Sequence, residues 1–181
     1  MIIDSHTHVD RFGWYDAPET IIRLMDEAGI AKSIIMIYGD APDVEGSLEY
    51  IAEAIDKYPD RLIGYARMNP QRGEEAHPDR FMGLCRADPW QGEAAVREVR
   101  KGFDELGACG LYLDPWEEGF QANDDLVLPL VEEAAQYAKP VVINAGHARV
   151  SHPTQSWDLA RRFPDVRFVA CNGGQINICG L

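Results

Sequence analysis

The strongest constraint on the fold is a regular alternation of two kinds of segment along the chain. Short, nearly continuous apolar runs are typical of strands that are covered on both faces. Between them lie segments whose apolar residues recur at helical spacing. Strands that alternate with helices in this way predict a parallel sheet with helices outside it. The expected strands are Ile2–Ser5, Ser33–Tyr38, Leu62–Ala66, Phe81–Cys85, Cys109–Leu113, Pro140–Asn144 and Val166–Cys171.

Crossovers of one hand, repeated along the chain, favour a barrel over an open sheet, although the pattern alone does not separate the two. A complete (β/α)8 barrel usually takes about 250 residues. This chain has 181, and only ten follow Cys171. We therefore expect an α/β fold, an incomplete (β/α)8 (TIM-like) barrel of about six βα units, as a single truncated domain over residues 1–181. The expected helices are centred on Ile21–Ala28, Leu48–Tyr58, Val96–Leu106, Leu130–Ala135 and Trp157–Phe163.

A duplicated segment interrupts this pattern at the third strand. Residues 58–76 and 77–95 are identical at nine of nineteen positions, and each copy holds a Pro-Asp-Arg motif, a strand and an Asn-Pro or Asp-Pro turn. Only about a dozen residues separate the two strands, close to the minimum for a parallel crossover. We expect no regular helix between them. Either one copy lies outside the regular sheet order, or the two share an irregular connection.

The first expected strand is followed by His6-Thr-His8. Side chains two residues apart on a strand project to the same side, so the two imidazoles are expected to converge at the end of a buried strand. Two converging imidazoles are half of a metal site. The alternative is a polar strand end whose histidines bond to loop backbone.

Composition excludes several classes of function. The net charge of −13 disfavours a nucleic-acid partner, because phosphate backbones are bound by basic surfaces. No apolar run approaches the ~18 residues that span a bilayer, and the N-terminus lacks the pattern of a signal peptide. We expect a cytoplasmic protein with a small-molecule substrate and no membrane partner. The four cysteines show no Cys-x-x-Cys spacing, which predicts reduced core residues.

Taken together, five segments in this order resemble the amidohydrolase superfamily, in particular its amidohydrolase-related branch of metal-dependent hydrolases and non-oxidative decarboxylases. Ile-Asp-Ser-His-Thr-His resembles the first-strand metal motif of that superfamily, and the match continues through the first six strands of its barrel. The segments are Ile3–His8, Tyr58–Arg67, Leu106–Pro115, Pro140–Gly146 and Phe163–Gly174.

The resemblance implies a divalent metal, usually zinc, held by His6 and His8. It would add histidines after the fifth and sixth strands and an aspartate after the eighth. In this sequence those two histidine positions are Asn144 and Asn172, and Asp114 stands where His is common. An amide oxygen is a poor zinc ligand beside imidazole. We therefore expect a degraded metal site, with Asp114, Asn144, His147 and Asn172 lining it, and the sequence assigns no catalytic residue.

Three functions remain open at this point. The first is a metal-dependent hydrolase or decarboxylase acting on a small carbonyl or carboxylate substrate. The second is a catalytically inactive barrel fragment that acts only as a structural or oligomerising module. The third is phosphoester hydrolysis, as in TatD-type nucleases or PHP-type phosphoesterases, whose further His, Glu and Asp ligands are not found here. An open barrel leaves edge strands and apolar surface, so we expect a homo-oligomer.

Overall fold

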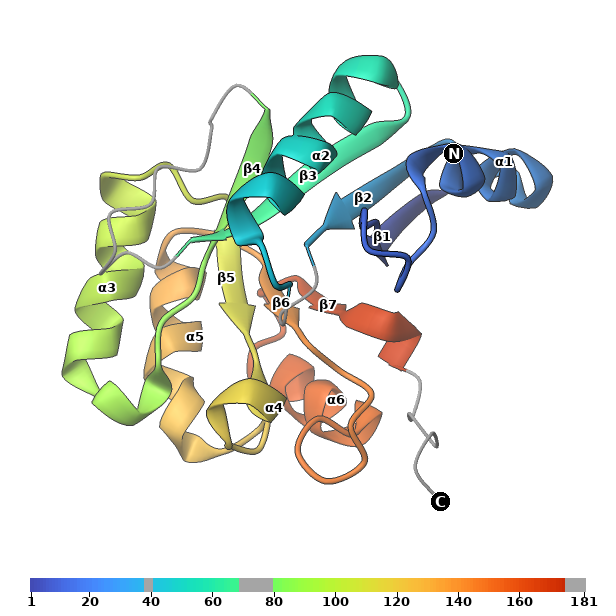
Figure 1. The fold of residues 1–181 in the computed structure, drawn as a ribbon. Coiled ribbons are helices and arrows are strands. Elements are labelled where there is room, and N and C mark those ends of the chain that lie inside the picture. Colours follow the sequence, from blue (N-terminus) through green and yellow to red (C-terminus); the bar gives the residue numbers. More distant parts are fainter. Residues whose placement is uncertain (38–40, 69–79, 175–181) are drawn as a thin grey trace. The chain divides into compact units, whose positions relative to one another are not determined.

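A computed structural model describes residues 1–37, 41–68 and 80–174 of the chain (Figure 1). The chain divides into two compact units. The first consists of Met1–Ala66 with Ala76–Met82, and the second of Arg67–Glu75 with Gly83–Leu181. The predicted single-domain organisation stays a prediction. No helix in the described part of the chain is long and apolar enough to cross a membrane.

The first unit alternates strands and helices. Strand β2 pairs in parallel with β1 on one side and with β3 on the other. Helix α1 has a proline at its start and ends at Gly29, whose left-handed φ of 68° suits a residue without a side chain. The carboxylate of Asp43 caps α2 by accepting from the backbone N–H of Gly46. The elements are β1 (Ile3–His8), α1 (Pro18–Ala28), β2 (Lys32–Met36), α2 (Val44–Lys57) and β3 (Leu62–Met68), whose Arg67 and Met68 belong to the second unit.

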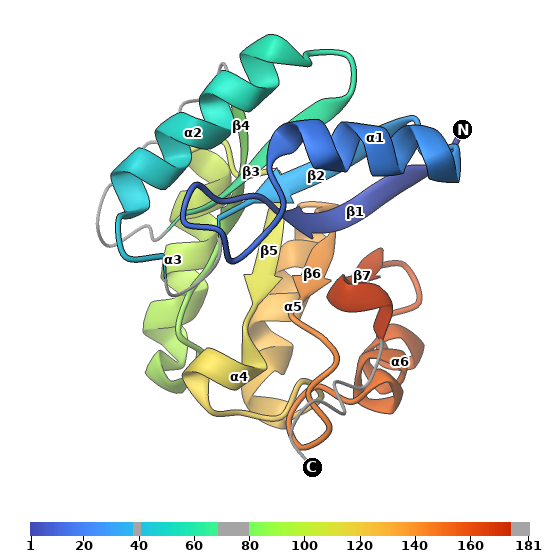
Figure 2. The ribbon, with the colours of Figure 1, turned by 45° about the vertical axis from the view of Figure 1, so that its right-hand side comes forward.

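Helices α1 and α2 bury their apolar stripes against this sheet, and Figure 2 shows α1 lying along β1 and β2. The prediction that Ile2 and Ile3 lie in a buried strand is wrong, because they are 58% and 45% exposed. Strand β1 pairs only with β2 among the described residues, so no second strand covers its start. The core consists of Val9, Ile21, Met25, Ile35, Ile51, Ala52, Ala54, Leu62, Ala66 and Phe81.

The register of β1 against β2 shifts between Asp4 and Thr7. Asp4 pairs with Ser33 and Thr7 with Ile35, so β1 holds one more residue than β2 over this stretch. An extra residue of this kind is a β-bulge, which bends a strand and re-aims its side chains. The carboxylate of Asp4 supports the bulge, since it accepts from the backbone N–H of His6 and from the hydroxyl of Ser33.

The second unit repeats the same arrangement. Strands β4 to β7 are parallel neighbours in chain order. Helix α3 packs beside α5, and α6 lies against β7 (Figure 1). The strands are β4 (Phe81–Cys85), whose Phe81 and Met82 belong to the first unit, β5 (Gly110–Leu113), β6 (Val141–Ile143) and β7 (Phe168–Ala170). The α-helices are α3 (Glu93–Asp104), α4 (Pro115–Glu118), α5 (Leu128–Gln136) and α6 (Pro153–Arg162), and the 3-10 helices are η1 (Pro89–Gln91), η2 (Asp125–Val127) and η3 (Cys171–Gly174).

These elements confirm the predicted fold class, an α/β fold of the incomplete (β/α)8 type. Both copies of the duplicated segment form parallel sheet strands: β3 pairs with β2, and β4 pairs with β5. The alternative that one copy lies outside the regular order is therefore wrong. The irregular connection predicted between them falls outside the described residues.

Candidate functional site

His6 and His8 converge at the C-terminal end of β1. Their Nε2 atoms lie 3.1 Å apart, and their rings meet edge to face with centroids separated by 4.7 Å. Both side chains are half-buried. The convergence expected from the two-residue spacing is therefore present, at the strand end where barrel enzymes place their active sites.

The second ring nitrogen of His8 is also engaged. Its Nδ1 lies 3.2 Å from the carbonyl oxygen of Met36, the residue that faces His8 in the register of β1 and β2. A carbonyl only accepts, so this bond requires a proton on Nδ1 and makes Nε2 the ring nitrogen that carries the lone pair, which faces Nε2 of His6. Histidines that bind metals usually donate their other ring N–H to a carbonyl or carboxylate in this way.

The distance between the two Nε2 atoms of His6 and His8 suits the binding of one divalent metal ion. Two imidazole nitrogens at ~2.0–2.1 Å from a tetrahedral zinc stand about 3.3 Å apart, close to the separation of the two Nε2 atoms. A complete protein site needs about three ligands. Within residues 1–37, 41–68 and 80–174, no group of three or more His, Cys, Asp or Glu side chains is arranged to hold a metal ion. The two histidines are thus half of a ligand set.

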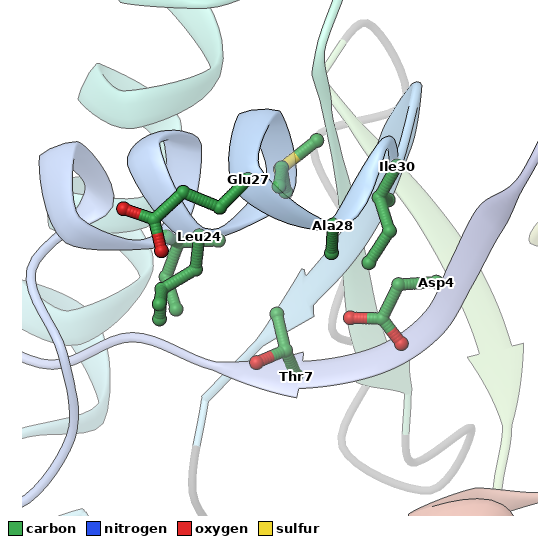
Figure 3. Close-up of a pocket in the computed structure, with 8 residues that line it drawn as sticks. Asp4, Thr7, Leu24, Glu27, Ala28 and Ile30 are labelled. Atoms are coloured by element: carbon green, nitrogen blue, oxygen red, sulfur yellow. The ribbon is translucent and has the colours of Figure 1, made fainter.

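A groove lies on the α1 side of β1 (Figure 3). Its volume is about 420 Å³, and Asp4 and Thr7 of β1 face the apolar side chains of α1 across it. On a regular strand, Asp4 would point with His6 and away from Thr7. The bulge places Asp4 and Thr7 on the same side, so the groove and the histidine pair occupy different sides of β1.

In the second unit, the predicted site residues Asp114 and Asn144 contact each other. Asp114 follows β5 and is fully buried, and its Oδ1 accepts from Nδ2 of Asn144 over 3.1 Å. The same oxygen accepts from the backbone N–H of Glu117, which caps the short helix α4. Both residues thus follow the C-terminal ends of neighbouring strands, and the bonds that Asp114 makes hold the loops together.

Asn172 has a local structural role. It lies in η3 after β7, with a left-handed φ of 57° that asparagine tolerates better than most residues. Its Nδ2 donates to the carbonyl oxygen of Ala145, which directly follows Asn144. Asn172 therefore joins the loops after β6 and β7.

His147 stacks on an exposed tryptophan. Its ring lies parallel to that of Trp116, with centroids 4.5 Å apart and an interplanar angle of 8°. Trp116 belongs to α4 and is 59% exposed. His147 lies in the segment after β6, and its backbone N–H donates to the hydroxyl oxygen of Ser151. The two loops therefore present one flat aromatic surface at the C-terminal ends of β5 and β6.

A charged cluster lies in the same loops. Arg86, which follows β4, donates to Glu118 over 2.7 Å and to Glu117 over 2.8 Å. The second carboxyl oxygen of Glu118 is buried and accepts no hydrogen bond among the described residues. Burial raises the pKa of Glu118 to about 7, and the bond from Arg86 offsets only part of that rise. The Glu117-Glu118 pair after a strand was visible in the sequence, but its partner, 31 to 32 residues earlier, was not.

The cysteines lie only partly in the core. Cys85 and Cys171 are buried, Cys109 is half-buried, and Cys179 lies outside the described residues; their reduced state stays a prediction. Burial raises the pKa of Cys85 to about 12, so this thiol stays protonated and unreactive at neutral pH.

Comparison with known families gives one extended match. Residues 3–178 match the family model described as Amidohydrolase, which confirms the family expected from the motifs. No curated protein matches the chain in sequence.

One similar solved structure is that of Bb4693 from Bordetella bronchiseptica, described as an uncharacterized TIM-barrel protein. The match covers 93% of this chain and 66% of the Bb4693 chain, with 18% identity and a TM-score of 0.52. The 2,6-dihydroxybenzoate decarboxylase from Rhizobium matches over 92% and 64%, with 17% identity and a TM-score of 0.46. The 5-carboxyvanillate decarboxylase from Novosphingobium aromaticivorans, crystallised with manganese and a nitrobenzoic acid, matches over 85% and 49%, with 19% identity and a TM-score of 0.42. The chain thus spans between about half and two thirds of the length of these structures.

Proposed function

The chain belongs to the amidohydrolase family, and we propose that it is a metal-dependent hydrolase or carboxy-lyase domain acting on a small carbonyl or carboxylate substrate. The observation that carries this proposal is the convergence of the His6 and His8 Nε2 atoms at 3.1 Å. Family membership supports the class of reaction, and the pair of imidazoles supports a divalent metal, with zinc as the first candidate.

His6 and His8 would hold the metal through Nε2. The carbonyl of Met36 supports the His8 tautomer with its proton on Nδ1, in which Nε2 carries the lone pair through which a metal would be bound. When bound, a divalent metal supplies a Lewis acid that activates water and polarises a carbonyl group. With two imidazoles and no third protein ligand in the described part of the chain, the affinity for zinc is expected to be weak.

The test is a metal titration of the purified full chain, by calorimetry, with zinc and with manganese. We expect weak binding of one equivalent, which His6→Gln and His8→Gln each abolish. His152→Gln is the matched control, because His152 caps α6 through Thr154 and is not one of the pair. The metal-loaded chain is then assayed for carbon dioxide release and for hydrolysis on a panel of small carboxylates, amides and lactones. Binding that survives both substitutions would overturn the proposed metal site.

A second candidate is a catalytically inactive module that folds and self-associates. It is favoured by the roles of the two asparagines that stand where the family resemblance implies histidines. Asn144 bonds to Asp114, and Asn172 bonds to the carbonyl oxygen of Ala145. Under this proposal the chain forms a homo-oligomer, binds no stoichiometric metal and shows no turnover with any substrate of the panel. Light scattering at tens of micromolar protein separates an oligomer from a monomer, and the metal titration separates the two candidates.

A further inference from the structure

The loop that follows the histidine pair folds around the carboxylate of Asp10, which accepts hydrogen bonds from its backbone amides. Oδ1 of Asp10 accepts from the backbone N–H groups of Phe12 and Gly13, each over 2.8 Å, and of Trp14 over 3.2 Å. Its Oδ2 accepts from the backbone N–H of Tyr15 over 2.8 Å. Four consecutive amides therefore point at one side chain, which is itself only 9% exposed.

Only a carboxylate suits this position. Its two oxygens offer about four lone-pair sites and no donor, whereas the amide of asparagine has one acceptor oxygen and an NH₂ group that would face an N–H of the loop. Hydrogen bonds to an ionised acceptor are also roughly twice as strong as neutral ones. The left-handed φ of 84° at Gly13 lets the chain turn tightly enough to bring all four amides inward.

The closed loop places an aromatic ring against the second histidine. The ring of Tyr15 lies 5.0 Å from that of His8, centroid to centroid, with an interplanar angle of 46°. His8 is thus held from two directions, by the Met36 carbonyl at Nδ1 and by the Tyr15 ring on its side. A ring confined in this way keeps one orientation and one tautomer.

We propose that Asp10 is a positioning residue for the histidine pair: by gathering the amides of residues 12–15 it holds Tyr15 against His8 and keeps the His8 imidazole aimed with Nε2 toward Nε2 of His6. The inference rests on the proposed metal-binding function, since it concerns how the imidazoles are presented. It assigns to Asp10 a role that is exerted on His8 through Tyr15. Partners that orient a metal-binding histidine typically contribute about 10- to 100-fold in metal affinity.

The test compares four variants in the full chain. Asp10→Asn and Asp10→Ala remove the acceptors, Tyr15→Ala removes the ring, and Tyr15→Phe keeps it. Zinc titration is expected to show a loss of about tenfold or more in affinity for Asp10→Asn, Asp10→Ala and Tyr15→Ala. Tyr15→Phe should retain the affinity of the unmodified chain. Asp124→Asn is the matched control, because Asp124 caps η2 in the second unit through the backbone N–H of Leu126.

A second measurement does not depend on metal. Long-range ¹⁵N–¹H NMR of the metal-free protein at pH 8 reports the tautomer of His8, which is expected to be protonated on Nδ1 in the unmodified chain and mixed in Asp10→Asn and Tyr15→Ala. If the unmodified chain binds no metal, the proposed function fails, while the tautomer still decides the role of Asp10. An unchanged tautomer together with unchanged zinc affinity in Asp10→Asn and Tyr15→Ala, with normal melting curves, would overturn the positioning role.

Discussion

Arg100 donates two hydrogen bonds to the carboxylate of Glu133, from Nε over 2.8 Å and from Nη2 over 3.0 Å, and so joins α3 to α5. The arrangement is asymmetric, because the side chain of Glu133 is 4% exposed and that of Arg100 is 50% exposed. The sequence predicts an amphipathic helix around Glu133. The burial of its side chain and its pairing with Arg100, 33 residues earlier, arise from the packing of α3 against α5.

Removing the Arg100 guanidinium should therefore lower the stability of the folded protein, because the buried Glu133 carboxylate loses its cation. Arg100→Ala leaves the Glu133 carboxylate without its cation, and we expect a loss of about 1 to 3 kcal/mol in the free energy of unfolding. Arg100→Lys should lose less, since lysine keeps the charge but not the two-pronged geometry. Urea denaturation of the three proteins measures the effect. The double change Arg100→Met with Glu133→Leu should restore stability, and equal losses in the single and double variants would contradict the explanation.

Glu118 should make stability depend on pH. The pKa of Glu118 is about 7 in the folded protein, above the ordinary value of 4.5. Between pH 4.5 and 7 the folded state therefore keeps a proton that the unfolded state has released. The stabilising contribution is fully present below about pH 4.5 and is lost as the pH rises through 7. The expected loss from this group is on the order of 2 to 3 kcal/mol.

The measurement is the free energy of unfolding from pH 5 to 8 for the unmodified chain and for Glu118→Gln. The glutamine is neutral throughout and still accepts from Arg86, so the variant should show a flatter profile. Glu132→Gln, at an exposed position of α5, is the control and should leave the profile unchanged. Parallel profiles for the unmodified chain and Glu118→Gln would mean that this carboxyl is not protonated near neutrality.

Asp114 should act mainly through the structure of its loop. Asp114→Ala removes the cap of α4 and leaves the half-buried amide of Asn144 without its Asp114 acceptor, which we expect to cost about 2 to 3 kcal/mol. Asn144→Ala should cost about 1 kcal/mol. The double variant should lose less than the sum, and the difference is the coupling energy of the pair. Additive losses would show that the bond contributes nothing measurable.

Gly64 should not tolerate a side chain. A Cβ atom there would stand 2.6 Å from the Cδ1 atoms of both Ile55 and Phe81, so a methyl group overfills the space between β3 and its neighbours in the first unit. We expect Gly64→Ala to lower stability by about 1 to 3 kcal/mol. Adding Phe81→Leu should recover part of that loss, with Phe81→Leu alone as the control. A stable Gly64→Ala variant with an unchanged melting temperature would contradict this packing.

The sequence predicted those features that depend on local periodicity. The strand Phe81–Cys85 has the bounds that its apolar run indicated, and the five amphipathic stripes all form helices. His6 and His8 converge because side chains two apart on a strand share a side, whatever the strand packs against. Family membership likewise followed from motifs that are read in order along the chain.

Other features depend on contacts between residues distant in the chain, and only the tertiary structure decided them. The exposure of Ile2 and Ile3 depends on whether a second strand pairs with β1. The bulge between Asp4 and Thr7 exists only as a register difference against β2, so no property of β1 by itself predicts it. The pKa of Glu118 depends on how deeply α4 is buried and on an arginine 32 residues earlier. Local sequence specifies which face of an element is apolar, whereas burial, register and charge pairing are properties of what that face meets.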